Sequence, residues 1–263
     1  MLNEISIVYS VKEIAENIFE VWFKSPRIST EIKPGQFVNI LPSNCWEKLM
    51  RRPMSVARQK KDKFSIMFRI IGQGTEIMSK WKVGEKVDII GPLGNYWEGY
   101  LDAFPVLMGG GIGTAPILNL HEHLGNLSIN HYLLAGARTS DEHFIKDNPE
   151  NQIFISTDNG SLGFHGNVLD LFKDNLISIV AKWEKIKIFA CGPPNMIDGM
   201  KDYCNDSGFE CDIALETLMA CGFGNCQGCA VEKKVNNQIN TTYRDRYALV
   251  CTDGPIFNSK DLK

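Results

Sequence analysis

The chain has 263 residues, 44% of them hydrophobic and 22% charged, which is enough for two compact domains and typical of a folded protein. Its 28 lysines and arginines and 31 aspartates and glutamates give a net charge of −3, which offers no basic surface for nucleic acid or anionic lipid. The N-terminus lacks a signal-peptide layout and no apolar run reaches about 18 residues, so we expect a cytoplasmic protein without a membrane segment.

Residues 1–100 contain apolar segments separated by proline and glycine turns, which predicts an antiparallel β-barrel or sandwich. The segments are ISIVYSV, IFEVWFK, GQFVNIL, KFSIMFRI and KVDII. One short helix is expected in this part of the chain, at TEIMSKW, because Ile77, Met78 and Trp81 have helical spacing.

Residues 101–212 alternate between apolar segments and helical patterns, which predicts a parallel sheet with helices on both faces. The expected strands are FPVLM, HYLLA, QIFIS, KIKIF and CDIAL. Helices are expected at 115–124, 141–146, 167–179 and from Pro194, the last one ending at Gly208. The remainder, 213–263, has weak periodicity and forms a third region.

A cluster of cysteines lies in this third region. Cys221, Cys226 and Cys229 have C-x4-C-x2-C spacing, and Cys251 follows 22 positions later. This is the plant-type arrangement of ligands for a [2Fe-2S] cluster. Glycines between them would let the loop adopt positive φ and bring backbone amides close to sulfur. A four-cysteine zinc site is the alternative, although zinc ligands usually come as two short pairs.

A glycine-rich turn follows the first strand of the predicted parallel sheet. The segment VLMGGGIGTAPIL contains Gly109, Gly110, Gly111, Gly113 and Thr114. Glycines at such a strand-to-helix turn let backbone amides approach a pyrophosphate at the helix N-terminus. The spacing is not a strict G-x-G-x-x-G, and a tight turn without a ligand is the alternative.

A second turn of this kind comes later in the same sheet. In KIFACGPPNM, at the far end of the sheet, Cys191, Gly192 and Pro193 follow a strand at a second carboxyl edge. We interpret this turn by the same logic as the first, as a nucleotide-binding turn, with an ordinary helix N-terminus as the alternative.

The barrel contains a further candidate phosphate site. RRPMSVAR holds Arg51 and Arg52, and FRIIGQGTEIMS places Gly74 and Thr75 at the start of the predicted short helix. An arginine together with a helix N-terminus and a hydroxyl can hold a pyrophosphate. The alternative is that both arginines are solvated surface charges.

The motifs RRPMS, GQGT, GPLG, GGGIGTAP and CGPPNM, in this order, resemble the ferredoxin–NADP reductase family. The C-terminal ACGFGNCQGC and VCTDGPIF resemble, more narrowly, the electron-transfer subunits of class 1B dihydroorotate dehydrogenases. This resemblance implies a multidomain β and α/β protein. Its parts would be an FAD-binding antiparallel β-barrel at 1–100, an NAD-binding parallel-sheet domain at 101–212 and a small [2Fe-2S] domain at 213–263.

The resemblance also implies roles for individual residues. Arg52 would bind the FAD pyrophosphate and Ser55 would lie near the flavin N5, while Cys191 would lie beside the nicotinamide. Met54 stands where many reductases have a tyrosine stacked on the flavin. The other residues expected at the flavin or its phosphates are Pro53, Met67, Phe68, Arg69, Gly74 and Thr75.

The choice between NADH and NADPH depends on residues after the second strand of the sheet. Arg138, in AGARTSDE, could reach a cofactor phosphate. Asp141 and Glu142 follow closely and would repel a 2′-phosphate, which favours NADH.

The resemblance implies an oxidoreductase subunit that works with a partner. An FMN-containing catalytic subunit would oxidise dihydroorotate to orotate in pyrimidine biosynthesis, and this chain would carry the electrons through [2Fe-2S] and FAD to NAD+. A heterotetramer with two copies of each subunit is expected. The surface around Cys221–Cys229, with Leu218, Met219 and Phe223, is a candidate docking face, unless these apolar side chains pack inside the domain.

Three alternatives remain open from the sequence. The chain could be a stand-alone diaphorase, or the small subunit of a related complex of the sulfide dehydrogenase or transhydrogenase type. It could also be a zinc-stapled nucleotide-binding module whose cysteines are only structural.

Overall fold

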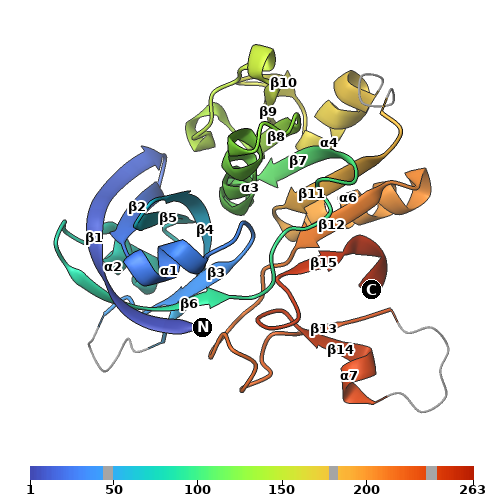
Figure 1. Ribbon diagram of the computed structural model, residues 1–263. Helices are drawn as coiled ribbons and strands as arrows, with labels where there is room; N and C mark the ends of the chain where they lie inside the picture. Colours follow the sequence, from blue (N-terminus) through green and yellow to red (C-terminus); the bar gives the residue numbers. More distant parts are fainter. Residues whose placement is uncertain (44–49, 178–182, 235–241) are drawn as a thin grey trace.

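The computed structural model describes residues 1–43, 50–177, 183–234 and 242–263. A β-barrel and a larger sheet lie side by side, and the C-terminal segment lies beside both (Figure 1). None of the helices among the described residues has the length and the apolar run needed to cross a bilayer.

The barrel is closed and antiparallel, with strand order β1-β2-β5-β4-β3-β6. Its strands are β1 (Leu2–Ala15), β2 (Ile18–Lys24), β3 (Phe37–Ile40), β4 (Arg52–Lys60), β5 (Lys63–Arg69) and β6 (Lys86–Leu93). Side chains alternate between the barrel interior and its outside, so Val38 and Ile40 of β3 lie in the core with Val8, Val21 and Phe64. The predicted barrel is confirmed, and closure leaves it without edge strands.

Two elements of the barrel were not predicted. The motif RRPMSVAR lies in β4 from Arg52 onward, because its alternating Met54 and Val56 contribute to the barrel core. A second short helix, α1 (Pro26–Glu31), accompanies the predicted one, α2 (Gln73–Ser79). Proline at the first position of α1 suits a helix start.

The second domain is a seven-stranded sheet with the order β10-β9-β8-β7-β11-β12-β15. The first six are parallel and run β7 (Phe104–Gly110), β8 (Tyr132–Ala137), β9 (Ile153–Thr157), β10 (Phe164–His165), β11 (Ile186–Cys191) and β12 (Glu210–Ala214). β7 is buried throughout, as expected for a parallel strand covered on both faces.

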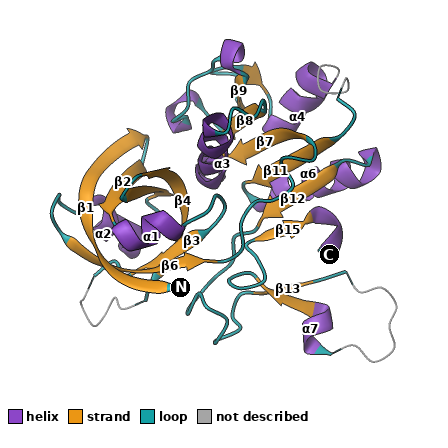
Figure 2. Ribbon diagram, in the orientation of Figure 1, coloured by secondary structure: helices purple, strands orange, loops and turns teal. Residues whose placement is uncertain are grey.

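The helices of this domain agree with the sequence in part (Figure 2). α3 (Thr114–Asn126) and α6 (Pro194–Ser207) form as predicted, and Gly208 ends α6 at φ +75°. The helix expected at 141–146 is wrong: only a 3-10 turn, Ser140–Glu142, forms there, because His143 is extended. The helix expected at 167–179 begins as α4 (Val168–Leu171) and continues as a π turn, Phe172–Leu176, while residues 178–179 lie outside the described ranges.

The C-terminal segment has little regular structure. Residues 215–229 form loops, and a hairpin follows from β13 (Ala230–Glu232) and β14 (Tyr247–Leu249), with the single turn α7 (Tyr243–Arg246) before β14. The chain then returns to the large sheet, where β15 (Ile256–Asn258) pairs antiparallel with β12, and ends after a 3-10 turn, Ser259–Asp261. The last strand therefore joins the sheet built mainly by 101–212.

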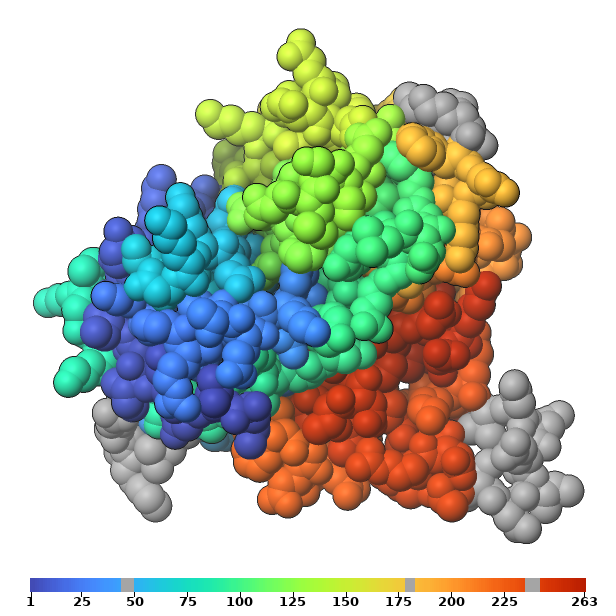
Figure 3. All heavy atoms as spheres, viewed as in Figure 1, coloured from blue at the N-terminus to red at the C-terminus, as the bar shows by residue number. Residues whose placement is uncertain are grey.

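The barrel contacts both other parts of the molecule. α3 packs against β4, and Met67 of the barrel joins an apolar cluster with Leu107, Ile117 and Phe189 of the sheet domain. On another side, Phe37 and Leu93 of the barrel pack with Cys229, Leu249 and Cys251. Figure 3 shows the C-terminal segment, in orange and red, against the barrel and the sheet domain.

Candidate functional site

A cavity of about 770 Å³ opens at the carboxyl edge of the parallel strands, beside the barrel. In open α/β sheets this edge is where nucleotides bind. Both predicted turns line the cavity, through Gly110, Gly111 and Gly113 from the first and Gly192 and Pro193 from the second. The fold therefore brings together two motifs that are about eighty positions apart in the sequence.

The two turns touch one another through glycine backbone. A Cβ on Gly113 would lie 2.6 Å from the Cα of Gly192, and one on Gly110 would lie 2.4 Å from the Sδ of Met196. Contacts below 3 Å require something to shift, so side chains at these positions would push the turns apart. Gly111 has φ +52° and open space in front of it, which leaves its backbone accessible from the cavity.

Three of the predicted residues at these turns support the cavity without lining it. Gly109 packs beneath the turn, where a Cβ would lie 2.6 Å from the Cα of Thr114, and Thr114 is itself buried. Cys191 ends β11 and is also buried. Burial, followed by the nearby charge of Glu216, raises the pKa of the Cys191 thiol well above its usual value, so this thiol stays protonated.

One carboxylate joins the barrel to the sheet domain at the rim of the cavity. Glu142 accepts hydrogen bonds from Arg138 at 2.5 Å and 3.3 Å, and from Arg69 of β5 at 3.1 Å. Burial opposes ionisation of Glu142, but the hydrogen bonds and charges of the two arginines outweigh it and hold its pKa below the usual value. Arg138, predicted to reach a phosphate, is therefore bound to the residue predicted to repel one.

Sequence reasoning missed several other residues of the cavity. Glu216 lies two residues after the end of β12, at the edge where ligands bind, and its side chain lines the cavity. Desolvation there raises the pKa of its carboxyl group. Asp158 and Asn167 also line the cavity. The signal for Glu216 was its place immediately after the apolar strand CDIAL, whereas the other two lie in loops without a motif.

The barrel brings together Arg52 and Gly74, as predicted. The guanidinium of Arg52 lies over Gly74 in the first turn of α2, where a Cβ would fall 2.6 Å from Nε. Arg52 also donates to the carbonyl of Met50 at 2.8 Å. An arginine beside a helix N-terminus suits a pyrophosphate.

The neighbouring residues divide between this site and local structure. The Thr75 hydroxyl accepts from the amides of Ile71 and Gly72 and donates to the Gly72 carbonyl, so it shapes the turn from within. Arg51 pairs with Asp88 at 2.8 Å inside the barrel wall and is not a solvated charge.

The predicted flavin residues of β4 and β5 lie on different faces of the barrel. Met54 packs against the barrel core, and so does Phe68, which stacks on Phe19. Met67 faces the sheet domain. Pro53 and Ser55 lie directly opposite Asn39 and Phe37 of β3, and directly opposed residues share one face of an antiparallel pair.

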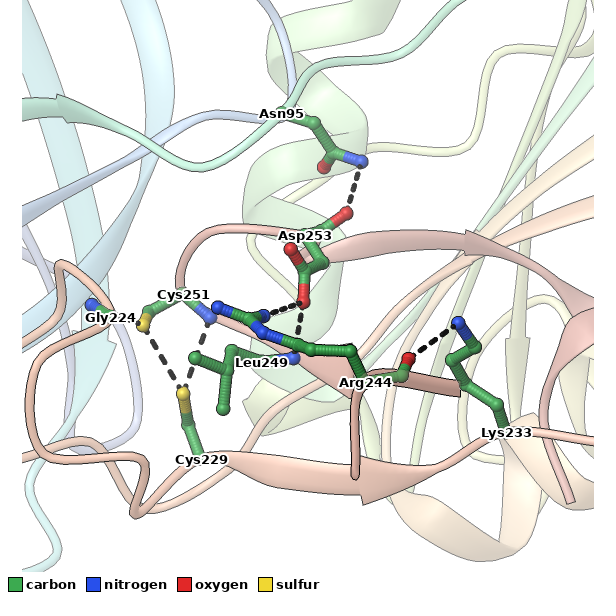
Figure 4. A network of polar contacts seen from close by, with 8 residues as sticks. All are labelled: Asn95, Gly224, Cys229, Lys233, Arg244, Leu249, Cys251 and Asp253. Carbon is green, nitrogen blue, oxygen red and sulfur yellow. Dashed lines mark hydrogen bonds and ion pairs between the residues drawn. The ribbon is translucent and has the colours of Figure 1, made fainter. Parts of the chain in front are cut away.

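The four predicted cluster ligands form two neighbouring pairs whose sulfur atoms accept from backbone amides, and Figure 4 shows one pair, Cys229 and Cys251. The Sγ atoms of Cys229 and Cys251 are 3.2 Å apart, and Gly224 donates to Cys251 at 3.2 Å. Cys226 donates to the Sγ of Cys221 at 3.4 Å. Within the described residues, no three His, Cys, Asp or Glu side chains are arranged to hold a single metal ion.

The two ends of this cysteine set differ in acidity. Burial of Cys221 opposes ionisation, but amides from Cys226 and Phe223 outweigh it and lower the pKa of the thiol to about 6. Burial and the adjacent Cys229 thiol raise the pKa of Cys251 to about 12. The Cys251 thiol would therefore lose its proton when a metal binds, as is normal for thiolate ligands. The four neighbouring cysteines fit a [2Fe-2S] cluster, and the backbone amide donors would stabilise its negative charge.

The chain is similar in sequence to proteins of one known family. Residues 216–263 match the family model described as the iron-sulfur cluster binding domain of dihydroorotate dehydrogenase B. A dihydroorotate dehydrogenase B (NAD(+)) electron transfer subunit from Desulforamulus reducens is 33% identical over 261 residues, covering 96% of this chain and 95% of the relative. The chain belongs to the family of dihydroorotate dehydrogenase B (NAD(+)) electron transfer subunits. The subunit of the same name from Fusobacterium nucleatum is 30% identical over 263 residues and covers 95% of each chain.

Solved structures give the same fold. A structure of the NADH-dependent reduced ferredoxin-NADP oxidoreductase, from work on flavin-based electron bifurcation, superposes with a TM-score of 0.83 and 27% identity, covering 99% of this chain and 90% of that one. Phthalate dioxygenase reductase superposes with a TM-score of 0.64 at 16% identity, covering 95% and 94%. This second likeness concerns the fold alone. The expected reductase fold is thus confirmed.

Proposed function

We propose that this chain is the electron-transfer subunit of a dihydroorotate dehydrogenase, and that it passes electrons from a partner's FMN site through [2Fe-2S] and FAD to NAD+. One arrangement carries the proposal: the barrel contacts both other parts, reaching the cavity through Arg69 and packing against the cysteine segment through Phe37 and Leu93. Flavin, when bound, supplies the change between two-electron hydride chemistry and one-electron transfer, so a position between the two other groups suits it.

Residues on one side of the barrel would bind the flavin. Arg52 and the first turn of α2, at Gly74, would hold the FAD pyrophosphate. Pro53 and Ser55 would lie along the flavin, on the face of β4 shared with Asn39 and Phe37. Met67 and Arg69 would contact it from β5, whereas Phe68 and Thr75 support the site from within.

The cavity would hold NAD(H) through backbone groups and exclude NADPH by charge. The glycine turns at Gly110–Gly113 and at Gly192 would approach the pyrophosphate closely. Arg69 and Arg138 are the cationic side chains among the described cavity residues, and both bind Glu142. With Asp158 and Glu216 also present, the wall carries more acid than base, and a 2′-phosphate would find no uncommitted partner.

The cysteine segment would be the face that meets the partner. Leu218 is 92% exposed and Phe223 44% exposed, beside the exposed Cys226, whereas Met219 packs into the small core around Cys229 and Cys251. Exposed apolar residues next to a redox ligand suit docking of an FMN-containing catalytic subunit. A heterotetramer with two of each subunit is part of this proposal.

A cytoplasmic location is a further part of the proposal. The cysteines among the described residues are all free thiols, including the four proposed ligands. Reducing compartments keep such thiols available for metal.

One other function has an observation in its favour. The structure with a TM-score of 0.83 is an NADH-dependent reduced ferredoxin-NADP oxidoreductase, so this chain could serve as the small subunit of a transhydrogenase-type complex. Copurification from the native host separates the two functions, because the partner would be an FMN-dependent dehydrogenase in one case and a ferredoxin- and NADP-linked subunit in the other.

The proposed function is tested on the isolated chain under anaerobic conditions. We expect FAD and about two irons and two sulfides per chain, as four cysteine ligands in this spacing imply. Stoichiometric NADH should bleach the flavin absorption. Stoichiometric zinc without sulfide, or a flavin that NADH does not reduce, would contradict the proposal.

A further inference from the structure

Asn39 is a completely buried amide at the contact between the barrel and the cysteine segment. On β3, its neighbours Val38 and Ile40 point into the barrel core, while Phe37 and Asn39 lie on the other face. The Nδ2 of Asn39 donates to the carbonyl oxygen of Cys221 at 2.9 Å. A barrel strand thus holds the backbone of a proposed cluster ligand directly.

The ligand loop is shaped to this amide. Gly222 follows Cys221 with φ +80°, and a Cβ there would lie 2.7 Å from Nδ2 of Asn39. Glycine is therefore required at 222 twice over, by the backbone conformation and by the contact. Because Gly222 packs directly against the Asn39 amide, a change in this side chain would move the loop itself.

Asn39 is itself held firmly in the barrel wall. Its backbone carbonyl accepts from Nη1 of Arg51 at 3.3 Å, and Arg51 forms an ion pair with Asp88 of β6 at 2.8 Å. Pro53 lies directly opposite Asn39 on β4, two residues before Ser55. Asn39 therefore connects Cys221 to β3, which pairs with the strand that carries the proposed flavin residues.

Only one end of the Asn39 side-chain amide has a hydrogen-bond partner among the described residues. Its Oδ1 is among the buried side-chain atoms that have no hydrogen-bond partner within the described structure. Leaving a buried acceptor unpaired is unfavourable, and an apolar side chain would avoid this. The donor side of the amide is what the fold uses here.

We propose that Asn39 is a positioning residue for electron transfer: it fixes the Cys221 end of the cluster-ligand loop against the flavin-binding strands, and so sets the placement of the cluster relative to the flavin. This rests on the proposed function, in which Cys221 is a cluster ligand. Asn39 acts through the backbone of Cys221.

The chain offers a matched control for this role. Asn119 of α3 is also a buried amide, 3% exposed, and its Nδ2 donates to the carbonyl of Val56 in β4 at 3.2 Å. It joins the sheet domain to the barrel in the same chemical way, at the contact between α3 and β4. Asn119→Ala therefore removes an equivalent bond at the other domain contact.

The experiment compares Asn39→Ala, the isosteric Asn39→Asp and Asn119→Ala in the full-length, anaerobically purified chain. Iron and sulfide content, the electron paramagnetic resonance spectrum of the dithionite-reduced protein, and the rates of flavin and cluster reduction after mixing with NADH are measured. For both Asn39 variants we expect normal flavin reduction, shifted g-values and cluster reduction slowed about tenfold, since small displacements of reacting groups have large effects on rate. Asn119→Ala should resemble the parent.

Each outcome decides one question. Cluster reduction and g-values unchanged in a fully loaded Asn39→Ala would overturn the assignment, and so would equal losses in Asn119→Ala. Loss of iron confined to the Asn39 variants, with equal thermal stability in all three proteins, would support the assignment because the ligand loop alone has been released. A parent protein without iron and sulfide would overturn the proposed function itself.

Discussion

The barrel meets its two neighbours in different ways. Against the sheet domain it uses charged pairs, Arg58 with Glu122 and Arg69 with Glu142, around an apolar cluster, in addition to the amide of Asn119. Against the cysteine segment it uses the amides of Asn39 and of Asn95, which follows β6 and bonds to Asp253 and Ile256.

The difference matches what each contact has to do. The Arg69–Glu142 pair lines the cavity that a charged dinucleotide would enter and leave, whereas amides bonded to backbone atoms hold a loop in one place. Hydrogen bonds made by side-chain amides do not titrate, and salt screens them less than it screens exposed ion pairs. The contact at the cysteine segment should therefore be the less sensitive of the two to pH and ionic strength.

The largest expected effect separates the two contacts by function. Cys226→Ser should abolish electron passage between the partner and NAD+, because a cluster ligand is lost. NADH-driven reduction of a dye should remain largely intact, because that route needs only the cavity and the barrel. Iron analysis with steady-state assays of both reactions checks this, and parallel loss of both activities would show that the two sides are not separable.

Arg52→Ala tests the proposed FAD site in the barrel. Removing a charge-assisted phosphate contact should weaken FAD binding by about 1.5–3 kcal/mol, or roughly tenfold to a hundredfold. Flavin content after purification and FAD titration of the apoprotein measure this. Arg27→Ala, an exposed arginine on α1, is the matched control and should keep its flavin; normal FAD affinity in Arg52→Ala would refute the assignment.

The charged contact should carry a pH dependence. His121 of α3 lies 2.8 Å from His131, next to Arg58; burial, then the charge of His131, lowers its pKa to about 4. A histidine whose folded pKa is depressed costs stability as pH falls below its unfolded value of about 6.5, because the unfolded chain takes up the proton first. We expect about 1–2 kcal/mol of stability to be lost between pH 7.5 and pH 5.

Denaturant unfolding at the two pH values measures this loss. His121→Gln should reduce the pH dependence, while His165→Gln, at an exposed histidine, should leave it unchanged. An identical pH profile in parent and His121→Gln would contradict the role given to this pair.

The smallest expected effect concerns cofactor choice. Glu142→Gln should free Arg138 and narrow the preference for NADH over NADPH about threefold to tenfold, as expected for one partly exposed charge contact. Asp141→Asn, in the same 3-10 turn, should leave the ratio unchanged, and adding Arg138→Ala to Glu142→Gln should restore the preference. Values of kcat/KM with both cofactors decide it; equal loss with both would indicate a purely structural role.

The sequence predicted the parts that depend on local pattern. Alternating apolar residues gave most of the barrel and sheet strands, and the glycine turns and cysteine spacing marked groups that the fold does bring together. The RRPMSVAR strand was missed because its residues were interpreted as a phosphate motif, although Met54 and Val56 alternate as in any strand. A single asparagine in the apolar segment GQFVNIL was the only sign of Asn39, and its partner Cys221 lies 182 positions away.

Ion pairs between domains also leave no signal in the local sequence pattern. The bond of Glu142 to Arg69 depends on how β5 of the barrel meets the turn after β8, which is a property of domain packing. Likewise, the return of β15 to the large sheet could not be expected from a segment with weak periodicity.

The most direct test of the account is whether the chain needs a partner to oxidise dihydroorotate. A TIM-barrel FMN dehydrogenase requires roughly 250 residues of its own, whereas the described barrel, sheet and cysteine segment already occupy most of this chain. The isolated, fully loaded chain is assayed with dihydroorotate and NAD+, and the FMN-dependent catalytic subunit is then added. The account predicts orotate and NADH only after addition, with formation of a stable complex; orotate from the chain alone, or no complex and no activity with the subunit present, would contradict it.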